Sequence, residues 1–361
     1  MGASLYVHIP FCAHLCPYCD FPKVIYQKAW ALAYLPALFD EIKKRDPGSC
    51  STIYLGGGTP SVLPNDLLDE LLSFLDPYLE EGGEFSIEMN PETIDEEKVL
   101  CLTKHKINRL SLGIQSSHDR LLKILGRHHD FARVAEAIGL LRGHGYSNIN
   151  GDLMYGLPGE SIKDLEQDIE AFLSLDLDHL SAYSLILEEG TLFHNEGIVE
   201  ADNDLQADMA ELISKRLKEH GYRHYEVSNY AKEGKRCRHN LVYWRDFEYV
   251  GCGLGASGYH HGVRYANTKN LTAYLRGHYE GTIEDSSPQS EYEIYLLTHL
   301  RLDEGFDIDD ARARVGESYA QRIEQGLPKL LKEGLLTKEG NRIRPSERGL
   351  MLLDRILLAL F

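Results

Sequence analysis

The sequence lacks the long apolar runs and the leading signal that mark membrane and secreted proteins. No apolar stretch approaches the roughly 20 residues that a membrane-spanning helix needs. The apolar C-terminal stretch 352–361 is interrupted by Asp354 and Arg355. The first residues show neither a basic segment nor a long apolar segment of the secretory type. We therefore expect a cytoplasmic protein without a membrane span, for which transient contact with a membrane protein stays open.

Basic residues are also scarce, with 38 Lys and Arg against 56 Asp and Glu and a formal net charge of -18. Proteins that bind nucleic acid draw much of their affinity from Lys and Arg on phosphates, so this balance argues against a nucleic-acid partner. The acidity serves solubility, or it provides a docking face for a basic partner.

Cysteine is sparse as well. Seven cysteines in 361 residues do not suggest the dense disulfide framework of small secreted proteins. In a reducing compartment, cysteines that cluster in the sequence more often hold a metal or perform redox chemistry. Cys50, Cys101 and Cys252 stand apart from any cluster and are interpreted as small apolar residues.

Strand-like and helix-like segments alternate over the first 230 residues. The strand-like segments are short and rich in β-branched or large apolar residues, as buried parallel strands are. This alternation predicts an α/β fold with right-handed crossovers, curved into a partial or complete barrel. The expected strands are 5–9, 52–55, 85–89, 109–114, 148–154 and 179–187, and the expected helices are 29–45, 65–75, 95–105, 131–144, 162–173 and 205–220.

The alternation ends at about residue 230. Residues 231–285 are rich in Gly, His and Tyr and show little regular pattern. Beyond them, helical segments flank two short strand-like segments around the turn at 339–341, an order that suggests a winged-helix-like α+β module. We therefore expect a barrel over 1–230, a connecting segment over 231–285 and a winged-helix-like domain over 286–361. A structural or partner-docking role is the preferred interpretation of this last domain.

Cys12, Cys16 and Cys19 form a C-x-x-x-C-x-x-C motif directly after the first expected strand. A structural zinc site usually has four closing ligands, whereas three thiolates on one tight loop suit three corners of a 4Fe–4S cubane. The fourth iron then has no protein ligand and can be chelated by an amino-carboxylate. His8 and His14 lie nearby, so a zinc site stays an alternative, as does a chance grouping of structural cysteines.

The turn after the second expected strand reads Gly56-Gly57-Gly58-Thr59-Pro60. Glycines allow a ligand to approach the backbone, and open N–H groups can hold a carboxylate. The alternative interpretation is a tight βα turn that binds nothing.

Polar residues also stand at the ends of later expected strands, namely Glu88, Gln115 and Asp152. In a parallel barrel these ends share the face that carries the chemistry. Ribose, amine or base contacts explain three such residues together better than helix caps do. Arg127 follows a short helical segment and can meet a carboxylate through a bidentate fork, or it can form a surface ion pair.

These residues resemble the radical S-adenosylmethionine superfamily. Within it, Y-V-H-I-P-F-C ending at Cys12, the G-G-G-T-P turn, G-I-Q ending at Gln115 and D-L-M-Y-G-L-P-G starting at Asp152 are similar to the oxygen-independent coproporphyrinogen III oxidase group. The resemblance covers nearly the whole chain and includes a HemN-type C-terminal domain. It implies a partial (β/α)6 TIM-like barrel, a 4Fe–4S cluster and bound S-adenosylmethionine.

The resemblance also implies which residues contact S-adenosylmethionine. To these we add Tyr18, an aromatic residue just before the third cysteine that can shield the cluster. Ile186 and Ala256 would contribute backbone or apolar contacts. The full predicted set is Tyr6, Tyr18, Gly57, Gly58, Thr59, Glu88, Gln115, Arg127, Asp152, Ile186 and Ala256.

Two branches of that group differ at the cysteine loop. The coproporphyrinogen III dehydrogenases carry a further cysteine two residues after the third and a longer N-terminal extension. This chain has Phe21 at that position, and its first motif cysteine is already residue 12. Both departures resemble the heme chaperone (HemW) branch.

A second motif supports this resemblance. His239, Asn240, Tyr243 and Trp244 match the H-N-x-x-Y-W signature of the heme-binding relatives. Histidine can be an axial iron ligand, and Tyr and Trp offer flat apolar faces to a porphyrin. Without the resemblance, a histidine beside two aromatic residues more often belongs to a core. Cys237, two residues earlier, is an alternative thiolate ligand.

Two functions follow from this resemblance. In the first, the chain is a heme chaperone that binds heme, a 4Fe–4S cluster and S-adenosylmethionine and passes heme to an acceptor protein. In the second, it is an oxygen-independent coproporphyrinogen III dehydrogenase that decarboxylates propionates by radical chemistry. Phe21 and the His239 motif favour the chaperone, so we expect no dehydrogenase activity and assign no catalytic residue.

Overall fold

A nine-stranded sheet forms the centre of the computed structural model, which describes residues 3–361. Its strands follow the order β11-β1-β4-β5-β6-β7-β8-β10-β9, and the six from β1 to β8 in this order pair in parallel. These six are β1 (Ala3–Ile9), β4 (Cys50–Gly57), β5 (Leu79–Met89), β6 (Arg109–Gln115), β7 (Ile149–Tyr155) and β8 (His179–Ser184). The predicted partial (β/α)6 barrel is thereby confirmed.

The two edges of the sheet explain why the barrel is partial. At one edge, β11 (Val250–Cys252) adds to β1 in parallel. At the other, β10 (Asn229–Ala231) pairs antiparallel with β8 and with β9 (Arg223–Glu226). Within residues 3–361, β11 and β9 do not pair with one another, so the sheet stays open.

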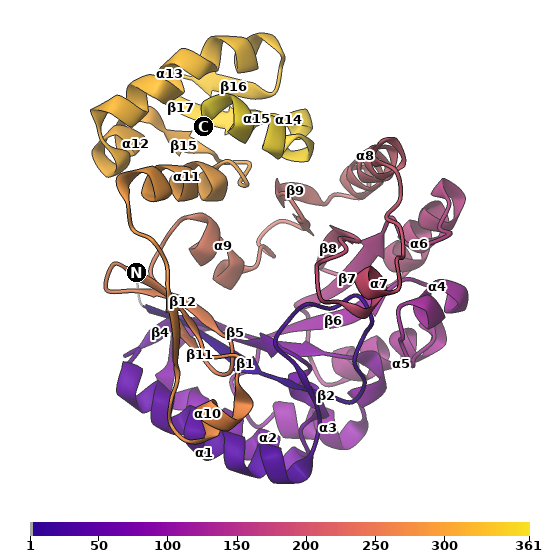
Figure 1. Cartoon of the computed structure of the whole chain (residues 1–361). Coiled ribbons are helices and arrows are strands. Elements are labelled where there is room, and N and C mark those ends of the chain that lie inside the picture. Colours follow the sequence, from indigo (N-terminus) through magenta and orange to yellow (C-terminus); the bar gives the residue numbers. More distant parts are fainter. Residues whose placement is uncertain (1–2) are drawn as a thin grey trace.

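Helices cover the outer face of the curved sheet (Figure 1). Several begin where the sequence provides a cap: the Asp95 carboxylate accepts from the Lys98 N–H, and Ser161 with Asp164 forms a capping box. The main helices are α1 (Lys28–Arg45), α2 (Asn65–Leu75), α3 (Glu96–Leu102), α5 (Phe131–Gly143), α6 (Ile162–Ser174) and α8 (Asn203–Glu219), and the short ones are η1 (Pro60–Val62), η2 (Asp76–Tyr78), η3 (Pro91–Thr93), α4 (Asp119–Ile124) and α7 (Leu192–Asn195).

Strand alternation separates an apolar outer layer from a polar interior. Leu5, Val7 and Ile9 of β1 are fully buried in the main core between sheet and helices. The inward side chains near the starts of the neighbouring strands and in the middle of β5 are polar and buried, and they include Thr52, Glu84, Arg109, Asn150 and His179. Inside the curve, His179 contacts Asn150 Oδ1 through Nδ1 at 2.6 Å. Most of these groups have hydrogen-bond partners, as buried polar groups generally require, although Arg109 Nε is buried without one.

The connecting segment closes the base of this interior. Helix α9 (Arg238–Trp244) carries the H-N-x-x-Y-W motif, and its first N–H groups meet a carboxylate of the barrel. Glu84 accepts from the N–H groups of Arg238 and His239, both at 3.0 Å. A small antiparallel sheet follows, made of β12 (Ser257–His260), β13 (Val263–Asn267) and β14 (Glu280–Ile283), with α10 (Leu271–Leu275) before the last strand.

The C-terminal residues form a module with a hydrophobic core of its own. Its elements follow the order helix, strand, helix, helix, strand, strand, and its three strands pair antiparallel as β15-β17-β16. This confirms the winged-helix-like fold, whereas the predicted boundaries at about 230 and 285 stay predictions. The elements are α11 (Pro288–His299), β15 (Phe306–Asp307), α12 (Ile308–Val315), α13 (Glu317–Lys332), β16 (Leu336–Glu339), β17 (Arg342–Pro345), α14 (Glu347–Met351) and α15 (Leu353–Leu360).

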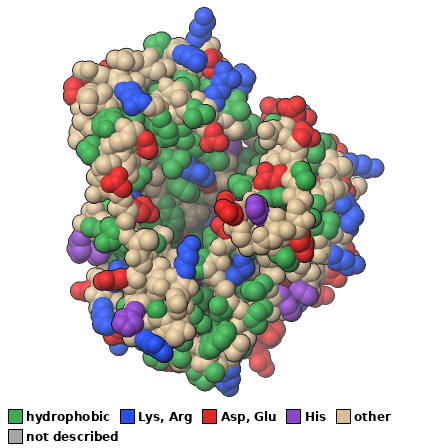
Figure 2. Space-filling view, in the orientation of Figure 1, with side chains coloured by type: hydrophobic (Ala, Val, Ile, Leu, Met, Phe, Trp, Pro, Cys, Tyr) green, Lys and Arg blue, Asp and Glu red, His purple; other side chains and the backbone are tan. Residues whose placement is uncertain are grey.

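No helix within residues 3–361 is both long enough and apolar enough to cross a bilayer. Figure 2 shows a hollow near the middle of one face of the molecule, between the C-terminal module and the α6–α8 side of the barrel, with hydrophobic side chains on its floor.

Asp246, the second residue after α9, joins three parts of the structure. It is 4% exposed, and its carboxylate accepts from Arg264 of β13 and from Arg314 of α12. Its φ of 54° lies in the left-handed region, which Asp and Asn tolerate better than most residues. The carboxylate therefore ties the end of the motif helix to the small sheet and to the C-terminal module.

We expect Asp246→Asn to lower the free energy of unfolding by about 2–3 kcal/mol, because two guanidinium groups lose a buried counter-charge. Asp176→Asn is a matched control, since Asp176 also has a positive φ and two cationic neighbours but is largely exposed. The control should change the stability by less than about 0.5 kcal/mol. Urea unfolding of both variants measures this, and equal losses would contradict the bracing role.

Candidate functional site

The three motif cysteines lie on one loop that leaves the carboxyl end of β1. Two short strands, β2 (Phe11–Cys12) and β3 (Val24–Ile25), pair in parallel and close this loop. Within it, the Cys19 N–H donates to the Cys16 carbonyl oxygen at 3.3 Å. Cys12 is buried, Cys16 and Cys19 are half-buried, and all three thiols are free. A tight loop thus carries three thiols that form no disulfide.

Two side chains from other parts of the barrel approach these sulfurs. The Thr59 hydroxyl points at Cys12 Sγ from 3.9 Å, and Arg127 Nη1 lies 3.7 Å from Cys16 Sγ. Tyr18 packs beside the loop in a small apolar cluster, with its ring 6.5 Å from that of Phe193. The guanidinium provides positive charge where thiolates would carry negative charge.

The glycine turn after β4 supports the cysteine loop rather than offering open N–H groups. The Gly57 N–H donates to Glu88 at 3.0 Å, the Gly58 N–H to Ile9 O at 2.8 Å and the Thr59 N–H to Phe11 O at 2.8 Å. The expectation that free N–H groups of Gly57, Gly58 and Thr59 hold a carboxylate is therefore wrong for this structure. That these residues contact S-adenosylmethionine in another way stays a prediction.

Close packing explains why glycines stand at this turn. Gly57 has a φ of 111°, and a Cβ there would lie 2.5 Å from the His8 ring. A Cβ on Gly58 would lie 2.7 Å from the Phe11 carbonyl oxygen. Only glycine brings the turn this close to the strand that leads into the cysteine loop.

Glu88 and Asp152 are acidic groups of the barrel interior. Glu88 accepts from the Tyr54 hydroxyl at 2.9 Å, and Asp152 accepts from Asn150 Nδ2 at 2.8 Å. Burial and the negative charge of Asp152 raise the pKa of Glu88 to about 7. Burial also raises the pKa of Asp152. A cationic ligand would favour the ionised forms of both carboxyls.

Gln115 ends β6 in an unusual conformation. Its φ of 73° is rare for a residue other than glycine, and its side chain is almost fully buried. The next N–H, that of Ser116, donates to the Ile114 carbonyl oxygen at 3.0 Å. Backbone strain of this kind persists only where the surrounding structure holds it in place. It is found most often at binding sites.

Asn90 joins the glycine turn to Arg127, and the sequence reasoning missed it. Its amide nitrogen donates to Thr59 Oγ1 at 3.2 Å, and its oxygen accepts from Arg127 Nη2 at 2.7 Å. The same Nη2 donates to the Gly113 carbonyl oxygen at 2.7 Å, while Arg127 Nε is buried without a partner. The only signal in the sequence is the position of Asn90, two residues after Glu88 at the end of a strand.

The last two predicted S-adenosylmethionine contacts, Ile186 and Ala256, lie in different surroundings. Ile186 lies in the loop after β8 and is 61% exposed. Ala256 is buried and lines a cavity of about 360 Å³ together with Tyr6 of β1. The cavity is mainly aromatic and joins the cysteine loop to α9, because it is also lined by His8, Phe21, Pro22, Tyr243, Trp244, Tyr249, Gly255 and Ser257.

His239 of the H-N-x-x-Y-W motif is enclosed in the structure. It is 0% exposed, its Nδ1 contacts Thr52 Oγ1 at 2.7 Å and its Nε2 contacts the Tyr243 hydroxyl at 2.7 Å. The ring also stacks on Tyr54 at a centroid distance of 5.2 Å. Both ring nitrogens are engaged, so iron can bind His239 only after one of these contacts opens.

The charge state and the exposure of the motif residues bear on which of them could bind iron or contact a porphyrin. Burial, helped by the positive charge of Arg109, lowers the pKa of His239 to about 3. The ring is therefore neutral near pH 7, the form in which histidine binds metals. Tyr243 and Trp244 line the cavity, and Asn240 is half-buried. Burial raises the pKa of Cys237 to about 12, which disfavours the thiolate needed for a ligand.

Comparisons with known proteins agree with this geometry. The profile of the Radical SAM superfamily matches residues 6–172, and that of the HemN C-terminal domain matches residues 287–352. The heme chaperone HemW of Lactococcus lactis is 37% identical over 96% of this chain and 94% of its own length. That of Bacillus subtilis is 36% identical over 97% and 96%, and that of Escherichia coli is 31% identical over 98% and 97%.

The chain belongs to the HemW family of radical SAM proteins. The solved coproporphyrinogen III oxidase (HemN) of Escherichia coli superimposes with a TM-score of 0.86 over 99% of this chain and 90% of that chain. At 22% identity this likeness concerns the fold alone. The predicted superfamily and the predicted HemW branch are both confirmed.

Membership in the radical SAM superfamily implies a 4Fe–4S cluster and S-adenosylmethionine, as predicted. The residues of this HemW-family chain fit both groups, because the loop offers three free thiols and Arg127 keeps a buried Nε without a partner. When bound, the pair supplies one-electron chemistry. Cys12, Cys16 and Cys19 would hold the cluster, while Arg127 would offset charge beside it and the Thr59 hydroxyl would donate to Cys12 Sγ. These individual assignments stay predictions.

We expect protein purified without oxygen to contain about four iron and four sulfide per chain. Cys12→Ser, Cys16→Ser and Cys19→Ser should each lose most of both, whereas Cys50→Ala, a buried cysteine outside the loop, should keep them. Iron, zinc and acid-labile sulfide analysis measures this. Stoichiometric zinc without sulfide in the unmodified protein would rule out the cluster.

Glu88 should make the ligand-free protein less stable as the pH rises. Its pKa is about 7 in the folded chain and about 4.5 in the unfolded chain, so the folded state retains the proton longer. Its contribution to stability is present below pH 4.5 and is lost as the pH rises through 7, by about 1–3 kcal/mol.

The matching variant is Glu88→Gln, which should remove this part of the decline between pH 5 and pH 8. Glu136→Gln, on an exposed carboxylate of α5, should leave the decline unchanged. Urea unfolding at several pH values tests both, and parallel pH profiles for Glu88→Gln and the unmodified protein would contradict the assignment.

Proposed function

We propose that this chain is a heme chaperone that binds heme at the α9 motif, carries a 4Fe–4S cluster and S-adenosylmethionine, and transfers heme to an acceptor protein. One observation carries the proposal: the aromatic cavity brings Phe21 of the cysteine loop together with Tyr243 and Trp244 of the motif. Flat apolar rings around one opening suit a porphyrin face. The HemW relatives are heme chaperones by name.

Phe21 separates this function from porphyrinogen oxidation. The dehydrogenases that the chain resembles carry a cysteine at this position, whereas Phe21 is 61% exposed and forms part of the cavity wall. The position therefore adds apolar surface to the cavity instead of a fourth thiol beside the cluster loop. An exposed aromatic ring beside an aromatic cavity supports ligand capture.

Heme loading requires α9 to loosen, because His239 is enclosed in this conformation. Besides the ion pair of Asp246 with Arg314, two contacts hold the end of the helix against the C-terminal module. Arg245 forms a two-point ion pair with Glu304 at 2.6 and 3.1 Å, and the Arg301 guanidinium lies 4.3 Å from the Trp244 ring centre. We propose that release of these contacts exposes Trp244 and frees the His239 ring for iron.

The acceptor is a protein that meets the chain in the cytoplasm or by transient contact at a membrane surface. The acidic net charge of -18 suits an acceptor with a basic docking face. The cluster and S-adenosylmethionine would then serve a redox, regulatory or assembly role beside the heme site.

We expect the purified chain to bind heme with a Soret band, and His239→Ala to weaken the affinity at least about tenfold because an axial ligand is lost. His260→Ala, which removes a half-exposed histidine of β12, should bind as the unmodified chain does.

Glu304→Gln should accelerate heme association about fivefold, the effect of removing roughly 1 kcal/mol of ion pairing. Heme titration and stopped-flow absorbance measure these quantities.

The same preparations test the other branch of the group. The chain should leave coproporphyrinogen III unchanged under anaerobic reducing conditions with S-adenosylmethionine. Turnover to protoporphyrinogen IX would overturn the chaperone assignment. An unchanged Soret band and affinity in His239→Ala, together with unchanged association in Glu304→Gln, would remove the motif helix from heme binding.

A further inference from the structure

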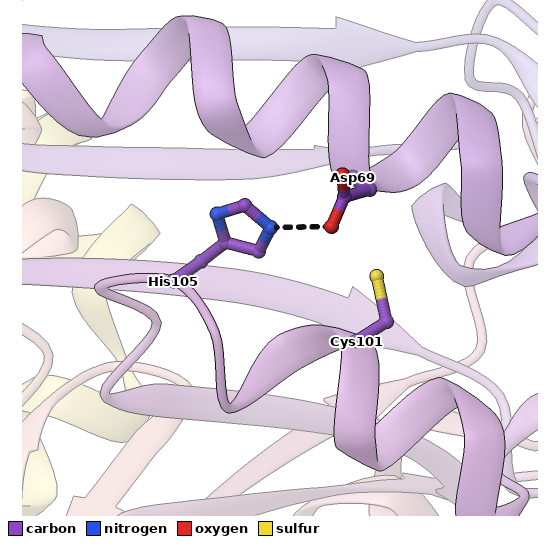
Figure 3. Close-up of side chains that lie close together, drawn as sticks. All are labelled: Asp69, Cys101 and His105. Atoms are coloured by element: carbon purple, nitrogen blue, oxygen red, sulfur yellow. Dashed lines mark hydrogen bonds and ion pairs between the residues drawn. The ribbon is translucent and has the colours of Figure 1, made fainter.

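Three metal-ligating side chains meet on the outer wall of the barrel, in a group that the proposed heme and cluster sites do not use. Asp69 lies on α2, Cys101 on α3 and His105 in the turn after α3. One ligand atom from each lies within 4.8 Å of the other two. Figure 3 shows the carboxylate, the sulfur and the imidazole converging on a common space between the two helices.

The hydrogen bonds of His105 leave a position for a cation. Its Nδ1 lies 2.9 Å from Asp76 Oδ2, and its Nε2 lies 3.2 Å from Asp69 Oδ1. A neutral imidazole has one N–H and one lone pair, so it can donate to only one of two carboxylates. With the proton on the shorter side, toward Asp76, the Nε2 lone pair faces the negative oxygen of Asp69. A positive charge between them, either a proton or a metal ion, resolves this repulsion.

Cys101 indicates which of the two cations, a metal ion or a proton, suits this position. Its side chain is buried, and the best partner of its sulfur is the Asn65 carbonyl oxygen at 3.6 Å, a weak contact. Burial and the negative charge of Asp69 raise the pKa of the Cys101 thiol, so that only a bound metal ion would favour the thiolate here. A thiol gains nothing from a protonated histidine that already has two carboxylates. A sulfur, an imidazole nitrogen and a carboxylate oxygen around one point form a donor set for a borderline divalent metal.

We propose that Asp69, Cys101 and His105 bind a zinc ion, with a fourth position left for water. The sulfur and nitrogen donors disfavour Mg²⁺ and Ca²⁺, which take oxygen ligands. The contact between Asp76 and His105 Nδ1 supplies the outer carboxylate that commonly orients a zinc-bound histidine. Small side-chain movements bring ligand atoms that lie within 4.8 Å to the separations of a tetrahedral site.

The ion would link α2 to α3 on the outer wall of the barrel. Helix α2 follows the glycine turn that supports Cys12, and α3 follows the strand that carries Glu88. A metal bridge at this point stabilises the outer wall without contacting the proposed cluster or the heme cavity. The zinc proposal therefore does not depend on the heme chaperone proposal.

The test uses the complete chain with its cluster reconstituted under anaerobic conditions, so that the three loop cysteines are occupied. Zinc is titrated by calorimetry, and Co²⁺ is titrated by difference absorbance, which reports thiolate ligation. We expect one equivalent to bind and to raise the midpoint of thermal unfolding. Cys101→Ser and His105→Gln should each weaken binding at least tenfold, and Asp76→Asn should weaken it by about 10–100-fold.

Two further variants keep the result interpretable. Asp69→Asn changes a side chain that is 46% exposed, preserves its shape and should weaken binding without unfolding the chain. His260→Gln alters the other group of possible ligands, formed by the half-buried His260 with the exposed Glu248 and His261, and should bind zinc as the unmodified chain does. Iron and sulfide are measured after each titration to show that the cluster is intact.

The proposal is overturned if the unmodified chain binds no zinc, which would leave a proton as the cation between His105 and Asp69. It is equally overturned if Cys101→Ser and His105→Gln bind one equivalent with unchanged affinity, or if only His260→Gln loses it. Heme titration of the same variants should give the affinity of the unmodified chain.

Discussion

The buried carboxylate of Glu84 is the contact on which the arrangement of the functional regions depends. It lies at the base of the barrel and accepts from the first N–H groups of α9, those of Arg238 and His239. Helix α9 closes the interior and lines the cavity, and the C-terminal module docks on it. Charge-assisted hydrogen bonds contribute about 1.5–3 kcal/mol each, and their loss would leave buried groups unpaired. One glutamate thus anchors the helix that joins the barrel to the rest of the chain.

The two ends of the barrel have different tasks that follow from their chemistry. At the carboxyl ends of the strands, glycines and the Thr59–Asn90–Arg127 contacts hold a loop with three free thiols. At the amino ends, buried polar groups satisfy one another and hold α9. The aromatic cavity connects the two regions along one side, where β11 adds to β1. A ligand in this cavity would contact both the cysteine loop and the motif helix.

In the closed state of α9, His239 is a core residue, although it is also the proposed iron ligand. Two hydrogen bonds hold the His239 ring, and one of them, to Tyr243, lies within the helix itself. The helix end is held by an Arg–Glu pair, a cation over Trp244 and the buried Asp246 carboxylate with its two arginines. Opening of this end therefore requires the release of Arg245 and Trp244 and a rearrangement around Asp246.

The sequence by itself determined the parts of this protein that depend on local pattern. The cysteine spacing, the strand and helix alternation and the H-N-x-x-Y-W stretch are short-range features, and they were enough to indicate the superfamily, the barrel and the HemW branch. The expected strands lie where the six parallel strands are found. The main differences are that β5 begins at Leu79 rather than 85, β8 ends at Ser184 rather than 187 and α3 ends at Leu102 rather than 105.

Tertiary structure alone decided which polar groups are free. The N–H groups of the glycine turn are used within the chain, and His239 is enclosed by Thr52, a residue 187 positions away. The sequence predicts that Cys101 is a plain apolar residue, and only the fold places it beside Asp69 and His105. Residue type states what a side chain can bind, but whether it has a partner already depends on contacts between distant segments, which periodicity and spacing do not encode.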